Sequence, residues 1–282
     1  MTTLVADEPA AMLNKVPRIT VFFWLIKLLA VTVGETAADY MNLDLGLGLT
    51  NTSIILAVLL AVALVVQFAQ NRYMPGIYWT AVVLISVVGT LVTDNLSDGL
   101  GVPLLYSTIG FSITLAITFA VWFRFEKTLS IHSIFTRRRE AFYWLAILFT
   151  FALGTAAGDL TAEQFGIGYL QTGLIFGALI AAIASFHFVF HINSILAFWL
   201  AYILTRPLGA SFGDWFSQDS AHGGLGFGTV DTSYIFLGAI AVLVGYLAIS
   251  HRDEDFEGGA GAQPQGLPLT TTSDEGVGDA AS

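Results

Sequence analysis

Four acidic residues occupy equivalent places in this 282-residue sequence, each at the end of a long apolar stretch. They are Asp39, Asp94, Asp159 and Asp214. Ionisable side chains inside membrane-spanning segments are rare and usually mark an ion or substrate pathway, and cation pores use rings of carboxylates. One hypothesis is therefore that the four aspartates form a site for a metal ion or a proton.

An alternative interpretation of these aspartates is structural. Each would lie at the C-terminal end of a helix, where the helix dipole disfavours a carboxylate by about 0.3–1 kcal/mol. A side chain that caps a following short helix would offset this cost. The segments DNLSD and DLTAE at residues 94–98 and 159–163 have a composition that allows such caps. Both interpretations remain open at the level of the sequence.

Three further ionisable residues lie within the same apolar stretches. Glu35 precedes Asp39 by four residues, so both lie on one face of a helix, and Glu35 is one turn deeper in the membrane. Lys27 and Arg206 lie deeper still, and a base there normally faces the bundle interior and is paired. Together with the four aspartates these residues give five negative and two positive charges, a balance that favours a cation. The alternative is that each base forms a static ion pair with a carboxylate of a neighbouring helix.

The aspartates belong to a pattern, Trp-x9-Gly-x4-Asp, that occurs four times and indicates a repeated structural unit. The two halves of the pattern are offset by 120 residues, which indicates a duplication. Each glycine is followed four residues later by another small residue, a spacing that lets membrane helices pack closely. Each tryptophan is interpreted as an interfacial anchor or as a contact between repeats. The residues are Trp24, Trp79, Trp144 and Trp199 with Gly34, Gly89, Gly154 and Gly209.

The repeats are built on apolar stretches long enough to cross a membrane. Only 11% of the residues are charged and 55% are hydrophobic, whereas a soluble domain has about 25% charged residues. A helix of about 20 residues crosses the hydrocarbon core. We predict an all-α polytopic membrane protein whose eight transmembrane helices form four parallel two-helix repeats in two duplicated halves, with the odd helices inside. The stretches are 18–38, 53–70, 77–94, 104–125, 141–159, 170–191, 194–213 and 233–250.

This architecture resembles a known family. With one tryptophan and two predicted helices in each copy, the chain is similar to bacterial membrane-anchored proteins that consist of four tandem copies of a repeat of unknown function. The resemblance covers roughly residues 17–250. It implies the architecture alone, because the family has no activity to carry over.

The basic residues predict the orientation. Apart from Lys27 and Arg206, every Lys and Arg falls near the start of a predicted odd helix or the end of an even one. Because cytoplasmic loops are rich in these residues, we predict a multi-pass protein of the bacterial cytoplasmic (inner) membrane with both termini in the cytoplasm. The predicted segments are a cytoplasmic N-terminal segment (1–16), a membrane domain (17–250) with repeats at about 17–75, 76–138, 139–196 and 197–250, and a disordered acidic cytoplasmic tail (251–282).

Other chemistry has little support in the sequence. His187 and His191 are four residues apart and could hold a metal ion from one helix face, which is a second and weaker metal hypothesis. The sequence contains no cysteine, phosphate-binding loop, nucleophile elbow or dinucleotide fingerprint. We therefore expect no enzymatic activity, no cofactor and no nucleic-acid partner, and we expect the lipid bilayer as the surrounding partner.

The residues favour one function and leave one rival. The favoured function is a secondary transporter or channel for a cation, with the intramembrane carboxylates as its binding site. Oxygen ligands without cysteine suit hard ions such as Mg²⁺, Mn²⁺, Ca²⁺ and Na⁺, or protons. The rival is a non-transporting membrane scaffold or sensor in which the repeated aspartates only cap and pack helices.

Overall fold

The computed structural model describes residues 14–253, and this part of the chain is helical throughout its regular elements. Eight of its helices are long and apolar enough to cross a membrane, which confirms the predicted fold class. The break between the sixth and seventh helices lies where the repeat pattern requires it. The long helices are α1 (Val21–Asp39), α2 (Gly48–Ala69), α3 (Pro75–Asp94), α4 (Leu104–Glu126), α5 (Arg137–Asp159), α6 (Tyr169–Phe190), α7 (Ser194–Ser217) and α8 (Thr229–Ser250).

The odd helices form a closed inner ring. Helix α1 packs on α3, α3 on α5, α5 on α7, and α7 packs back on α1. In the apolar windows of these four helices 61, 67, 61 and 56% of the residues are buried, against 22, 17, 6 and 22% in the even helices. The predicted inner cluster of odd helices is therefore present, and the even helices present most of their side chains to the surroundings.

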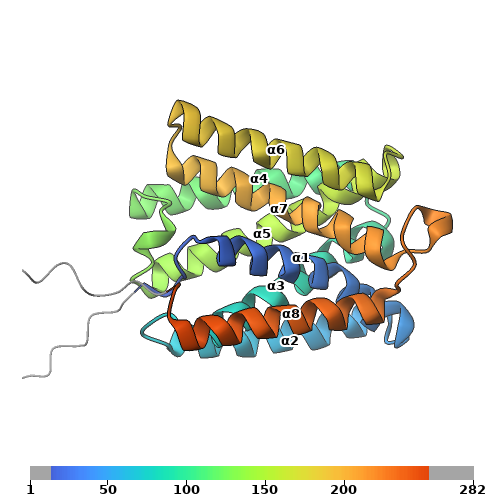
Figure 1. Ribbon diagram of the computed structural model, residues 1–282, viewed down its shortest axis with the longest axis horizontal. Helices are drawn as coiled ribbons and strands as arrows, with labels where there is room; N and C mark the ends of the chain where they lie inside the picture. Colours follow the sequence, from blue (N-terminus) through green and yellow to red (C-terminus); the bar gives the residue numbers. More distant parts are fainter. Residues whose placement is uncertain (1–13, 254–282) are drawn as a thin grey trace, which may run out of the picture.

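Each even helix packs chiefly on the odd helix of the next repeat. Helix α2 lies on α3, α4 on α5 and α6 on α7, while α8 returns to lie on α1 (Figure 1). The repeats are thus interlocked, and the last one closes the structure against the first. This arrangement makes the ring dependent on contacts between residues that lie far apart in the chain.

The repeated glycines explain how closely the inner helices approach. A Cβ atom on Gly89 would lie 2.7 Å from the Cβ of Phe151, and one on Gly209 would lie 2.6 Å from Val31 Cγ1. Real Cβ contacts essentially never fall below 3.0 Å, so these positions require glycine. Each glycine faces the residue that lies three positions before the glycine of the next repeat in the ring. The four pairs are Gly34 with Ser86, Gly89 with Phe151, Gly154 with Arg206, and Gly209 with Val31.

The repeated tryptophans lie mainly in the core. Trp79, Trp144 and Trp199 are 1, 3 and 4% exposed, so their interpretation as interfacial anchors is wrong, and packing between repeats is the correct one. Trp79 contacts Phe23 of the neighbouring α1 with ring centroids 5.7 Å apart, and Trp199 contacts Phe119 of α4 at 4.8 Å. Because each tryptophan precedes its aspartate by 15 residues, an aromatic layer lies about 22 Å along the helices from the aspartates.

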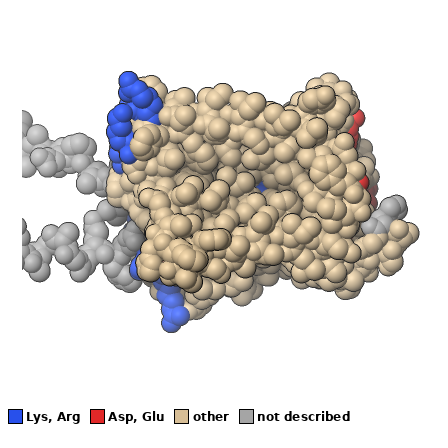
Figure 2. Space-filling view, turned by 90° about the horizontal axis from the view of Figure 1, so that it is seen from above, with Lys and Arg blue, Asp and Glu red and all other residues tan. Residues whose placement is uncertain are grey.

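Charges are separated between the two ends of the molecule. Lys and Arg gather at the end from which the helices α1, α3, α5 and α7 start, and Asp and Glu appear at the opposite end (Figure 2). At the basic end the Arg18 amide donates to the Asp253 carbonyl at 2.9 Å, and the Tyr73 hydroxyl donates to the Asp253 carboxylate at 2.5 Å. Burial, and then this bond, raise the pKa of Tyr73 above its usual range. Asp253 is buried, and the predicted tail from residue 254 on lies outside the described residues.

Candidate functional site

The site begins where the inner helices end. Asp39, Asp94 and Asp159 are the last residues of α1, α3 and α5, and each is followed directly by a five-residue π-helical turn. In the described structure none of the three side chains caps the turn that follows it. Asp214 lies within α7, which continues to Ser217. The capping interpretation is therefore wrong, and the dipole cost of these carboxylates is not offset by caps.

Three carboxylates converge at this end of the ring. Glu35 of α1, Asp159 of α5 and Asp214 of α7 each offer an oxygen within 4.8 Å of the other two. Asp39 and Asp94 lie outside this group, although they occupy equivalent positions in their repeats. The sequence predicted a site of four aspartates at one depth with Glu35 beneath them. The structure instead brings two of the aspartates together with Glu35, which we call the carboxylate group.

Arg206 holds Glu35 in the centre of the ring. Its Nη2 lies 2.9 Å from Glu35 Oε2 on α1, and it also donates to the Thr90 hydroxyl on α3. The Thr90 hydroxyl lies 3.2 Å from the same Glu35 oxygen. Gly154 of α5 provides the space for Arg206, because a Cβ at that position would overlap the arginine side chain. Arg206 of α7 thus contacts all three other inner helices, and the predicted ion pair with a neighbouring repeat is present.

Lys27 does not take part in the carboxylate group. Its Nζ donates to the Tyr202 carbonyl at 2.7 Å and to the Thr205 hydroxyl, and lies 3.7 Å from the centre of the Tyr202 ring. Within the part of the chain that the structure describes, no carboxylate forms an ion pair with this amine. The expectation that Lys27 pairs with a carboxylate is therefore wrong, because the side chain points across the α1–α7 interface toward aromatic rings.

Two members of the carboxylate group lack hydrogen-bond donors. Asp214 is 8% exposed, and within residues 14–253 neither its carboxylate nor that of Asp159 accepts a bond from another side chain. Two ionised carboxylates 4.8 Å apart repel each other by about 3 kcal/mol at an effective dielectric constant near 20. A bound cation or a shared proton would remove this repulsion.

Four segments of the chain match one family, described as a repeat of unknown function (DUF347), at residues 22–73, 77–128, 142–193 and 197–253. These matches cover most of the described residues. The chain belongs to the DUF347 repeat family. Each DUF347 match contains an odd helix with its aspartate, the loop after it and the following even helix. No curated protein and no solved structure matches the chain.

In this DUF347 protein a second polar cluster closes the basic end. Lys15 and Glu140 form an ion pair of 2.6 Å in which both side chains are buried, and Gln67 donates to the other Glu140 oxygen at 3.1 Å. The Lys15 amine also donates to the Phe68 carbonyl at 3.2 Å. Sequence reasoning missed this cluster. The one available signal was a single acid, Glu140, directly after three arginines at the start of an odd helix.

The two histidines of the weaker metal hypothesis are arranged differently from the expectation. Helix α6 ends at Phe190, and His191 follows it with a left-handed backbone, so the two rings do not share a helix face. His187 Nδ1 lies 3.0 Å from the Ile192 carbonyl. Among the described residues, the structure gathers neither histidine into a cluster of three ligand side chains.

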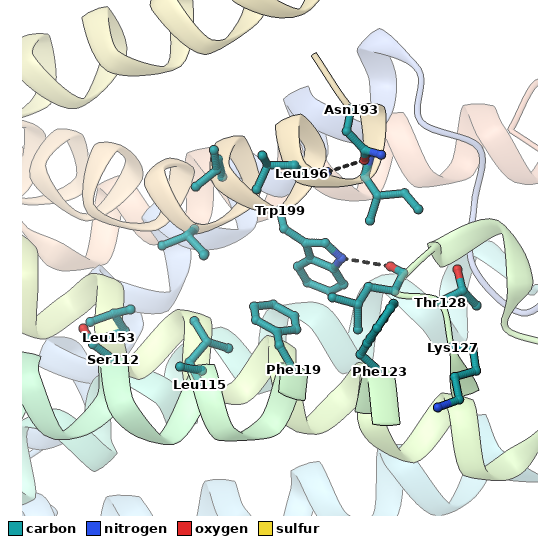
Figure 3. Close-up of a pocket in the computed structure, with 15 residues that line it drawn as sticks. Ser112, Leu115, Phe119, Phe123, Lys127, Thr128, Leu153, Asn193, Leu196 and Trp199 are labelled. Carbon is teal, nitrogen blue, oxygen red and sulfur yellow. Dashed lines mark hydrogen bonds between the residues drawn. The ribbon is translucent and has the colours of Figure 1, made fainter. Parts of the chain in front are cut away.

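Two apolar grooves of this DUF347 protein lie away from the carboxylates. One, of about 580 Å³, runs between α4 and α7 with Leu115, Phe119 and Leu153 along it. Trp199 lies in this groove, where its indole N–H donates to the Leu129 carbonyl at 2.9 Å (Figure 3). An equivalent groove lies between α6 and α1 beside Trp24. None of the predicted ion-binding carboxylates lines either groove.

Proposed function

We propose that this multi-pass membrane protein is a secondary transporter or channel for a cation, and that Glu35, Asp159 and Asp214 hold the ion. The observation that carries the proposal is the convergence of three carboxylates from three inner helices within 4.8 Å of one another. Two of them have no hydrogen-bond donor among the described residues, so they are free to bind an ion. Their hard oxygen ligands suit a hard metal ion or a proton.

The packing on either side of the carboxylate group favours a transporter over an open channel. Arg206 fills the ring centre beside Glu35, and the aromatic layer and the buried Lys15–Glu140 pair lie further toward the basic end. An ion could therefore reach the group from the acidic end, and its passage to the basic end would require these contacts to rearrange. Parallel repeats around an axis along the membrane normal are a known basis for such movements.

The charge distribution supports a location. The basic end in Figure 2 would face the cytoplasm of a bacterium, which makes the acidic end external and puts both termini inside. The acidic surface would then attract cations toward the group. No enzymatic activity and no cofactor are part of this proposal.

Ion flux into proteoliposomes tests the proposal. Purified protein is reconstituted, and uptake of Mn²⁺, Ca²⁺, Na⁺ and protons is followed with ion-sensitive dyes for the wild type, Asp214→Asn and Asp159→Asn. We expect each substitution to abolish most of the flux of the transported ion. Asp98→Asn is the control, because Asp98 is an exposed acid at the same end outside the carboxylate group. Unchanged flux in both Asp214→Asn and Asp159→Asn, or no flux of any ion in the wild type, would favour the scaffold instead.

A further inference from the structure

One positive residue, Arg206, offsets part of the negative charge of the carboxylate group. The carboxylate group carries three negative charges when ionised, and Arg206 adds one positive charge 2.9 Å from Glu35, so the sum is −2. An arginine keeps its charge in proteins, so this contribution is permanent. Arg206 also donates hydrogen bonds to the Val31 carbonyl at 3.4 Å and to the Thr90 hydroxyl, and it fits because Gly154 has no side chain.

The oxygens of the group already have the spacing of an ion-binding site. An ion at the centre of three oxygens that lie within 4.8 Å of one another would be at most about 2.8 Å from each, and calcium–oxygen distances are about 2.3–2.6 Å. The three carboxylates would supply part of the roughly six to eight oxygen ligands that Ca²⁺ takes, and water would supply the rest. An independent sign of a ligand is Asp214, which is more than nine-tenths buried, contributes an oxygen to the group, and has no hydrogen-bond donor among the described residues.

We infer that the ion is a divalent cation with hard-ligand preference, such as Ca²⁺, Mn²⁺ or Mg²⁺, and that Arg206 determines this preference by neutralising one of the three carboxylates. The inference rests on the proposed function. A divalent ion brings the sum of charges in the ring centre to zero, whereas Na⁺ or a single proton leaves one negative charge there. Such an excess is costly at a site where two of the three carboxylates are buried.

Three carboxylates outside the group add negative charge at the same end. Asp39 and Asp94 end α1 and α3, and Glu163 lies in the turn after α5, so all three favour an ion of higher charge and do not reverse the preference. Lys27 is directed toward Tyr202 and Thr205, away from the carboxylates. The equivalents of Glu35 in the second and third repeats, Thr90 and Thr155, are uncharged, so these two repeats carry no counterpart of its charge.

A charge series tests the inference. Melting temperatures are measured in detergent at matched ionic strength with NaCl, MnCl₂, CaCl₂ or TbCl₃, for the wild type (−2), Asp159→Asn (−1) and Arg206→Gln (−3). A ligand that binds only the folded state raises the melting temperature in a saturable way. We expect the strongest stabilisation by a divalent ion in the wild type and by Tb³⁺ in Arg206→Gln. Asp159→Asn should lower the apparent divalent affinity at least about tenfold.

Asp94→Asn is the matched control, since it removes the equivalent acid of the second repeat from outside the group, and it should keep the wild-type response. If Arg206→Gln does not fold, Asp159→Asn decides alone, because it leaves the Arg206–Glu35 pair intact. Stabilisation of the wild type by Na⁺ alone would overturn the divalent preference and leave the proposed function standing. Equal stabilisation of the wild type and Asp159→Asn by a divalent ion would overturn the inference. If no ion changed the melting temperature of the wild type and no ion flux were observed, both proposals would be overturned.

Discussion

The two halves of the chain share one packing rule and differ in their charges. Residues 120 apart are equivalent, so Gly89 corresponds to Gly209 and both lie against the next inner helix. At the same offset Glu35 corresponds to Thr155, Lys27 to Ile147 and Arg206 to Ser86. The comparison teaches that close packing depends on residues present in every copy, whereas the Glu35–Arg206 pair consists of residues that each occur in one copy.

The largest expected difference between the halves is at Glu35 and Thr155. Glu35→Ala leaves the buried Arg206 charge without its partner, and loss of one member of a buried pair costs about 3–5 kcal/mol. Thr155→Ala removes a hydroxyl that donates to the Phe151 carbonyl of its own helix, at 3.2 Å, and should cost about 1 kcal/mol or less. Unfolding free energies in detergent micelles measure both. Equal losses would contradict a charged centre confined to one copy.

A smaller effect, shared by both halves, is expected at the glycines. Gly89→Ala and Gly209→Ala should each lower stability by about 1–3 kcal/mol, because the new methyl group meets Phe151 or Val31 at less than 3.0 Å. Gly110→Ala on the exposed face of α4 is the control, since nothing lies within 4 Å of its Cβ position. Thermal unfolding of the three variants checks this. If only one of the two inner glycines were sensitive, the common packing rule would fail.

The smallest effect is expected at Lys27. Replacement by Met leaves no carboxylate unpaired, so stability should change by about 1 kcal/mol or less, in either direction, and stabilisation by cations should be unchanged. Ile147→Met makes the matched change in the second half and conserves volume. Melting curves with and without MnCl₂ test both variants. A lost response to Mn²⁺ in Lys27→Met alone would mean that this charge belongs to the ion site after all.

Much of the fold could be predicted because membrane helices leave strong local signals. Apolar length, the Trp-x9-Gly-x4-Asp pattern and the small residues predicted eight helices and an inner ring, and all of these are present. The predicted ion pair of Arg206 with another repeat was also correct, since a buried arginine needs a partner. These predictions needed only the depth and the face of each side chain.

The predictions that were wrong needed knowledge of the neighbouring helix. Lys27 and Glu35 share a face of α1, yet Lys27 meets the rings of α7 and Glu35 meets Arg206. The tryptophans have the position along the chain that is expected of interfacial anchors, yet three of them are buried in the core between helices. The Lys15–Glu140 pair joins residues 125 positions apart, and no local pattern announces such a contact.

The sequence by itself determined the number of helices, the repeat, the segregation of basic residues to one end and the depth of every aspartate. These properties follow from hydrophobicity and period, which are local. Only the tertiary structure decided that Asp159 and Asp214, and not Asp39 and Asp94, join Glu35 around the charge of Arg206. The physical reason is that the partners of a side chain depend on the helix that faces it, as when Arg206 of α7 pairs with Glu35 of α1 across the ring.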